Sequence, residues 1–132
     1  MKIQRIERIL QKHIDDLFNP NIKDIRRICL HNDDSDLLHV MLISIPPNSS
    51  YPIHIHKSKK EFYFLIKGYF EVHYHDTDLI IKETVIMSDS STVSTAVEIG
   101  IAHSVSSNLL GALFLEITTG PFIKEDTIIL SP

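Results

Sequence analysis

The sequence contains a single cysteine, Cys29, among its 132 residues, so no disulfide can form within the chain. This scarcity fits a reducing compartment. No apolar run approaches the roughly 20 residues that a membrane-spanning helix needs, and the charged start of the chain lacks the apolar stretch of a signal peptide. We therefore expect a cytoplasmic protein that makes no contact with a membrane.

An excess of basic residues is also missing. Thirteen Lys and Arg stand against 17 Asp and Glu, which gives a net charge of -4. Nucleic acid is therefore an unexpected partner, because phosphate binding requires a basic face. One basic cluster, Lys57, Lys59 and Lys60, is either a solvated loop or a patch that steers an anionic substrate. The composition, 43% hydrophobic and 23% charged, is that of one globular domain.

The first 20 residues show helical periodicity. Apolar side chains recur at steps of three and four residues with charges between them, which predicts an amphipathic helix of about four turns. Asn19-Pro20 would end this helix. The residues of the apolar stripe are Ile3, Ile6, Leu10, Ile14 and Leu17. We accordingly expect a helical segment at residues 1–20 and a single β-domain at residues 21–132.

Beyond residue 20, short segments rich in Ile, Val, Phe, Tyr and Thr replace the helical pattern. Their spacing predicts an all-β antiparallel sandwich or barrel, and a jelly roll fits the number of strands. Several segments are apolar on both faces, so the outer face needs the helix or a second subunit to cover it, and we expect a homodimer. The segments lie at 26–31, 37–45, 51–56, 61–67, 69–75, 79–87, 95–99, 103–107 and 111–118.

The sequence contains a pattern typical of a metal site. His54 and His56 are separated by one residue and would point the same way from an extended chain. Glu61 begins the next apolar run, Gly68 follows it, and His103 lies downstream after a glycine turn. Three imidazoles and one carboxylate suit a divalent transition metal. The alternative is that His54 and His56 are surface histidines on an edge strand.

A second His-x-His pair, His73 and His75, has no carboxylate at the corresponding distance. Phe70, Val72 and Tyr74 occupy the opposite phase of the same predicted strand. If these three face inward, both histidines face solvent. We therefore expect His73 and His75 at the surface, outside the metal site.

The His54, His56, Glu61 and Gly68 spacing is that of the first motif of the cupin superfamily. The superfamily has a glycine where this chain has Asn48, and Asn is the commonest substitute for Gly at positive φ. Of the second cupin motif only Gly100 and His103 are present. The chain most resembles the WbuC-type cupin fold metalloproteins of bacteria, a resemblance that also rests on Arg27…His31, Ser50-Tyr51, Glu116 with Gly120-Pro121, and Asp126…Ser131-Pro132.

This resemblance implies a cupin jelly-roll barrel that follows the N-terminal helix. It also implies a sugar-related substrate, because WbuC-type proteins look to be associated with bacterial surface polysaccharide synthesis. Glu116 belongs to the resembling pattern, which makes it a candidate catalytic residue near the metal, as proton carrier or substrate contact. The alternative is that Glu116 faces solvent from an apolar strand.

Four further residues are candidates for substrate binding. Arg27 and His31 either line the mouth of the barrel and bind an anionic or sugar substrate, or are polar residues at a strand edge. Tyr51 and Tyr63 either line the pocket or serve in packing. The small-molecule ligand expected from these residues is a sugar or a sugar nucleotide.

Histidine and carboxylate ligands suit Fe(II), Zn(II), Mn(II), Ni(II) or Co(II), and the sequence does not choose among them. Such an ion polarises a carbonyl or hydroxyl group, or lowers the pKa of a bound water. We prefer a metal-assisted isomerase, epimerase, hydrolase or lyase. An Fe(II) dioxygenase and a non-catalytic module that binds a metal or a ligand are the alternatives.

Overall fold

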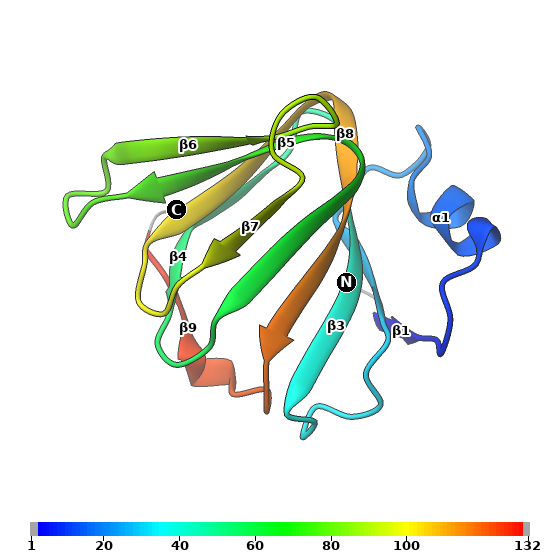
Figure 1. The fold of residues 1–132 in the computed structure, drawn as a ribbon, viewed down its shortest axis with the longest axis horizontal. Coiled ribbons are helices and arrows are strands. Elements are labelled where there is room, and N and C mark those ends of the chain that lie inside the picture. The colour runs from blue at the N-terminus through cyan, green and yellow to red at the C-terminus, as the bar shows by residue number, and fades with distance from the viewer. Residues whose placement is uncertain (1–2, 131–132) are drawn as a thin grey trace.

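The computed structural model describes residues 3–130, and within them it has nine strands, one α-helix and one 3-10 turn (Figure 1). The predicted all-β jelly roll with one N-terminal helix is confirmed. Residues 1 and 2, Ser131 and Pro132 lie outside the described residues. The elements are β1 (Ile3–Arg5), α1 (Gln11–Leu17), β2 (Arg26–Cys29), β3 (Leu38–Ile45), β4 (Ser50–His56), β5 (Glu61–His75), β6 (Ile81–Met87), β7 (Ser94–Val97), β8 (His103–Thr119), the turn η1 (Lys124–Asp126) and β9 (Thr127–Ile129).

Two long strands, β5 and β8, tie the two sides of the barrel together. The first part of β8 pairs with β4 and with the second half of β5, whereas residues 112–119 pair with β3 and with the first half of β5. The exchange takes place near Gly68 and Gly111, which have φ angles of 88° and 67°. The segments expected from the sequence place breaks between strands at or near these glycines. That prediction was wrong, because each glycine bends a strand that continues through the corner.

Alternation along β5 builds the inside of the barrel. Glu61, Tyr63 and Leu65 are buried, and after the register shift at Gly68 the buried residues are Phe70 and Val72. Phe70 stacks on the ring of Phe114 from β8 at a centroid distance of 4.6 Å. One end of the barrel is thus filled with apolar side chains, while the end that begins at Glu61 carries polar ones.

The N-terminal helix is shorter than the sequence predicts. Residues 3–5 form β1, which runs parallel to β2, and α1 contains only Gln11–Leu17. The backbone N–H of Ile6 donates to the carbonyl of Cys29, so the start of the chain follows the sheet instead of coiling. Ile6 still packs beside Leu17 in the outer apolar cluster, which explains the misleading periodicity. The division into residues 1–20 and 21–132 stays a prediction.

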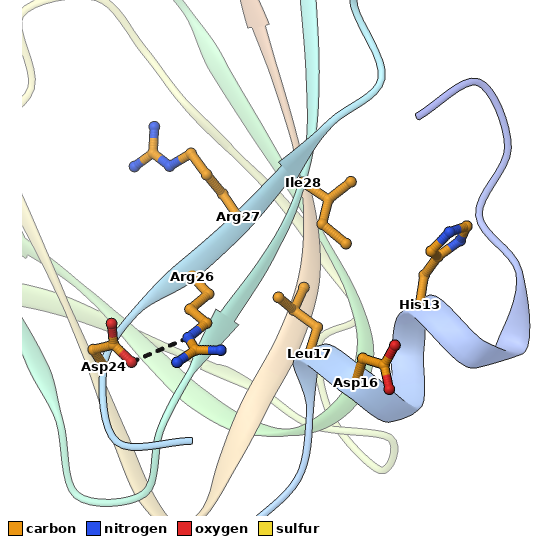
Figure 2. A pocket seen from close by; sticks show the side chains of 7 residues that line it. All are labelled: His13, Asp16, Leu17, Asp24, Arg26, Arg27 and Ile28. Carbon is orange, nitrogen blue, oxygen red and sulfur yellow. Dashed lines mark hydrogen bonds and ion pairs between the residues drawn. The ribbon is translucent and has the colours of Figure 1, made fainter. Parts of the chain in front are cut away.

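Strand β2 presents different residues to the inside and the outside of the barrel. Ile28 faces outward, where it packs with Leu17 of α1, and Arg26 on the same face forms an ion pair with Asp24 at 3.2 Å. Figure 2 shows the side chain of Arg27 on the opposite side of the strand, pointing away from the helix. The next inward residue, Cys29, is buried as the sequence predicts, and burial raises the pKa of its thiol.

Part of the outer face stays uncovered by the helix. Phe62, Phe64 and Ile66 point outward from β5 and are 40%, 47% and 39% exposed. The cluster around α1 contains residues of β2, β3 and β8 but none of these three. The homodimer stays a prediction that this apolar row supports.

Candidate metal centre

The four predicted ligands converge at the polar end of the barrel. His54 and His56 end β4, Glu61 begins β5, and His103 begins β8, directly opposite His54 in the β4–β8 ladder. Their ligand atoms all lie within 4.8 Å of one another. All four side chains are buried, with exposures between 0% and 6%. This group of His54, His56, Glu61 and His103 is referred to below as the four-ligand cluster.

Hydrogen bonds at the far side of each ring orient the three histidines. Nδ1 of His54 donates to the carbonyl of Pro52, and Nδ1 of His103 donates to the carbonyl of Ile101, both at 2.9 Å. Nδ1 of His56 lies 2.9 Å from Oγ1 of Thr127 in β9. Because a carbonyl oxygen only accepts, Nδ1 of His54 and His103 carries the proton, and Nε2 of the neutral ring points a lone pair into the site.

The carboxylate of Glu61 lies so close to two imidazole nitrogens that a proton or a cation is needed between them. Oε1 of Glu61 lies 2.7 Å from Nε2 of His56 and 3.1 Å from Nε2 of His103. The contact with His56 lacks hydrogen-bond geometry, so this buried nitrogen has no hydrogen-bond partner. Lone pairs on nitrogen and a carboxylate oxygen repel unless a proton or a cation lies between them. The donor set, its burial and this orphaned nitrogen therefore fit a divalent metal ion.

Burial also sets the charges of the cluster. Burial, with the repulsion that a protonated His103 would exert, lowers the pKa of His54 to about 4. Burial opposes ionisation of Glu61, but the hydrogen bond with His103 and the close contact with His56 outweigh it and hold the pKa of this carboxyl well below its usual range. A neutral imidazole beside an ionised carboxylate is the protonation state that binds a metal.

Glu116, the candidate catalytic residue, lies inside the barrel beside the four-ligand cluster. It is opposite Tyr63 in the β5–β8 ladder and is hydrogen-bonded to Glu61. Burial, the negative charge of Glu61 and this hydrogen bond raise its pKa well above the usual value. The opposite directions of these two pKa shifts favour a single proton for the pair, held on Glu116. The sequence left open whether Glu116 faces solvent, and the structure directs it into the barrel.

The four candidate substrate-binding residues surround the same cavity, which has a volume of about 370 Å³ and also contains the ligands His54, His56 and Glu61. Arg27 and His31 come from the β2 side and Tyr51 from β4. Tyr63 is buried, and its hydroxyl donates to Oε1 of Glu61 at 3.2 Å. Their roles in substrate binding remain a proposal.

Several residues of the site could not be found from the sequence. His39 is buried, stacks on His31 at a centroid distance of 4.0 Å, and lines the cavity. Thr127 and Lys124, from the β9 region, also line it. No local motif distinguishes these residues, because the fold alone brings them to the cavity.

The second His-x-His pair lies away from this cavity. Nε2 of His73 bonds with Ser106 at 2.9 Å, and Nε2 of His75 bonds with Ser104 at 2.8 Å. Phe70 and Val72 point inward, which was the condition for surface histidines, and His73 and His75 are half-buried instead of fully exposed. His73 therefore offers a matched histidine outside the site.

Replacing Thr127 with Val is expected to weaken metal binding by roughly 10- to 100-fold, because His56 loses the hydroxyl that orients its ring. Competition with a chromophoric chelator measures the affinity. The variant Thr127→Ser retains a hydroxyl and should bind like the wild type. Equal affinity of Thr127→Val and the wild type would show that β9 does not support the centre.

Comparison with solved structures assigns the fold to the cupin class. The match to CapF in complex with the inhibitor 3-isopropenyl-tropolone has a TM-score of 0.67 at 14% identity and covers 87% of this chain but 34% of the CapF chain. A protein from Klebsiella pneumoniae with a double-stranded β-helix domain gives 0.65 at 12% identity, with 90% and 95% covered. The lyase DddQ from Ruegeria pomeroyi, which acts on DMSP, gives 0.64 at 16% identity, with 93% and 56% covered.

These identities establish the fold alone, and this chain spans about a third of the length of CapF. The model of the family described as Domain of unknown function (DUF6016) matches residues 11–87, more than half of the sequence, so the chain belongs to this family. The matched range includes the first three ligands but ends before His103 and Glu116. No curated protein sequence matches the chain. Among residues 3–130, no helix is long and apolar enough to cross a membrane.

Proposed function

We propose that this cupin binds one divalent metal ion through the four-ligand cluster and is an enzyme that moves a proton on a small polar metabolite. The proposal rests on the position of Glu116 in the cavity beside Glu61, where burial and the charge of Glu61 raise the pKa of Glu116 well above its usual value. An acid held protonated beside a carboxylate costs stability, and such perturbed pairs cluster at sites of proton transfer.

The bound ion would polarise a carbonyl or hydroxyl group of the substrate or lower the pKa of a water. His54, His56, Glu61 and His103 would hold it, and the metal could be Fe, Zn, Mn, Ni or Co. Glu116 would give its proton to the substrate or take one from it. Loss of that proton would leave two negatively charged carboxylates side by side. Their repulsion would favour the return of a proton to Glu116. Such alternation serves an isomerase, an epimerase or a lyase.

A sugar-related substrate from bacterial surface polysaccharide synthesis is the class that we favour. The resemblance to WbuC-type proteins supports it, as does the structural similarity to CapF, a capsular polysaccharide assembling protein from Staphylococcus aureus. The cavity volume of about 370 Å³ is at the small end of the roughly 300–1,000 Å³ range of ligand pockets. A monosaccharide-sized molecule fits this volume better than a sugar nucleotide does.

Metal content tests whether the four-ligand cluster binds a metal ion. Protein purified without chelator or affinity metal should contain about one divalent ion per chain by mass spectrometry of the elements, since a cluster of this kind binds one ion. His54→Ala and His103→Ala should each lose most of it, because each removes one of the four buried ligands.

The matched control is His73→Ala, which removes a histidine outside the cavity and should leave the metal content unchanged. Full occupancy in both ligand variants would contradict the proposed centre. Occupancy lost equally in all three variants would point to a general failure to fold.

A further inference from the structure

Arg27 is a cation inside the barrel without an anion to match it. Its side chain lies on the inner face of β2 and lines the cavity. Its Nη1 makes a weak contact with Sδ of Met41 at 3.7 Å, and its Nε is buried without any hydrogen-bond partner. No carboxylate of residues 3–130 forms an ion pair with it, whereas its neighbour Arg26 is paired with Asp24 outside the barrel.

An unpaired donor of this kind is costly. Removing a charged donor from water without giving it an acceptor is unfavourable, so buried arginines are nearly always paired. The acidic residues that line the cavity with Arg27 are Asp34, Glu61 and Glu116, and none of them forms an ion pair with it. Asp34 contacts Arg5 at 3.6 Å, and Glu61 contacts His56 and His103. The guanidinium of Arg27 is therefore left for a group that enters from outside.

With a metal ion bound, the charges that surround the cavity act in the same direction. Arg27, Lys59 and Lys124 line it as cations, and Asp34, Glu61 and Glu116 are its acidic residues, so the formal charges balance before any metal binds. A divalent ion held by the four-ligand cluster would make the cavity positive. The cavity would then draw anions toward it in a protein whose net charge is -4.

We propose that the metabolite bound in this cavity is anionic, and that its carboxylate or phosphate group binds to the guanidinium of Arg27 while its hydroxyl or carbonyl oxygens reach the four-ligand cluster. This inference rests on the proposed function only for the contact between the substrate oxygens and the four-ligand cluster. A planar guanidinium presents paired N–H donors that match two oxygens of a carboxylate or a phosphate. The substrate class is therefore a monosaccharide-sized sugar acid or sugar phosphate.

Matched sugars test the anion requirement in the metal-loaded protein. Glucose, glucuronate and glucose 6-phosphate share one ring and differ in charge, and their binding can be measured by NMR titration at constant ionic strength. At least one anionic sugar should bind the wild type about tenfold or more tightly than glucose, the worth of a charged hydrogen bond. Whichever of glucuronate and glucose 6-phosphate binds more tightly identifies the anionic group, carboxylate or phosphate. Equal binding of all three sugars, or no binding of either anion, would overturn the inference.

Arg27→Gln and Arg26→Gln form the matched pair of variants, because they remove the same charge from the two faces of one strand (Figure 2). Arg27→Gln should abolish the preference for the anionic sugar, whereas Arg26→Gln should retain it. Preference retained in Arg27→Gln, or lost equally in both, would overturn the proposal.

Two measurements separate this outcome from other failures. Metal content should be equal in both variants and the wild type, so an empty centre would count against the proposed function and not against the role of Arg27. Arg27→Lys retains the positive charge and should perturb the fold less than Arg27→Gln does. Its preference for the anionic sugar should lie between that of Arg27→Gln and that of the wild type.

Discussion

Glu116→Gln is expected to slow turnover by roughly 100- to 10,000-fold, the usual contribution of a general acid or base. The amide has the same shape as the protonated carboxyl group and still fits beside Glu61, but its N–H groups are too weakly acidic to give a proton to the substrate. Metal content should therefore stay unchanged. The raised pKa of Glu116 adds a second expectation: in a reaction that needs it as an acid, activity persists well above the usual pKa of a glutamate and falls once the group ionises.

Proton NMR in D2O can follow this reaction before its product is identified. Sugar acids and sugar phosphates incubated with the metal-loaded protein should exchange a carbon-bound hydrogen or convert to a new species. Glu83→Gln removes a carboxyl group from the exposed strand β6 and is the control. Equal rates in Glu116→Gln and the wild type would exclude Glu116 as the proton carrier. Metal-dependent binding of these sugars without any conversion would support the non-catalytic module instead.

Gly68→Ala is expected to destabilise the fold by more than about 3 kcal/mol, beyond the range of ordinary substitutions. A Cβ at this position would lie 2.2 Å from the carbonyl oxygen of Gly111, which belongs to the paired backbone of β8 and cannot move aside. The φ of 88° adds the strain that an L-residue meets in the left-handed region. Denaturant unfolding measures the loss.

Gly100→Ala separates the two causes. Gly100 also has a positive φ, 75°, but a Cβ there would meet no atom within 4 Å. This variant should lose only about 1–2 kcal/mol, the cost of the backbone conformation. Similar losses in the two variants would show that β8 yields at the corner and that the close approach of Gly68 and Gly111 is not needed.

Local patterns predicted the fold class, whereas the limits of its strands depend on pairing. Asn48 takes a φ of 53°, as its place in the cupin pattern predicts. Gly68 and Gly111 were expected to end strands, because a glycine at a sharp bend and a glycine at a strand end have the same sequence signature. The strands β1 and β9 have three residues each, too few for a periodicity to show.

The same limit applies to the site. His54 and His56 could be paired from the sequence because the two-residue period of a strand is local. Glu116 could not be assigned a direction, since the residues on both sides of it are apolar and either face could have been buried. Thr127 contacts His56 across 71 positions of the sequence, so its role depends on where β9 adds to the barrel.

The pairing of β9 with β4 completes the site with a late part of the sequence. The segment through residue 119 contains all four proposed ligands and the strands that pair with β8. Thr127, whose Oγ1 lies 2.9 Å from Nδ1 of His56, comes after that segment. Proteolytic removal of β9 would therefore leave the β3–β8–β5 pairing complete and would take away the contact that orients one proposed ligand.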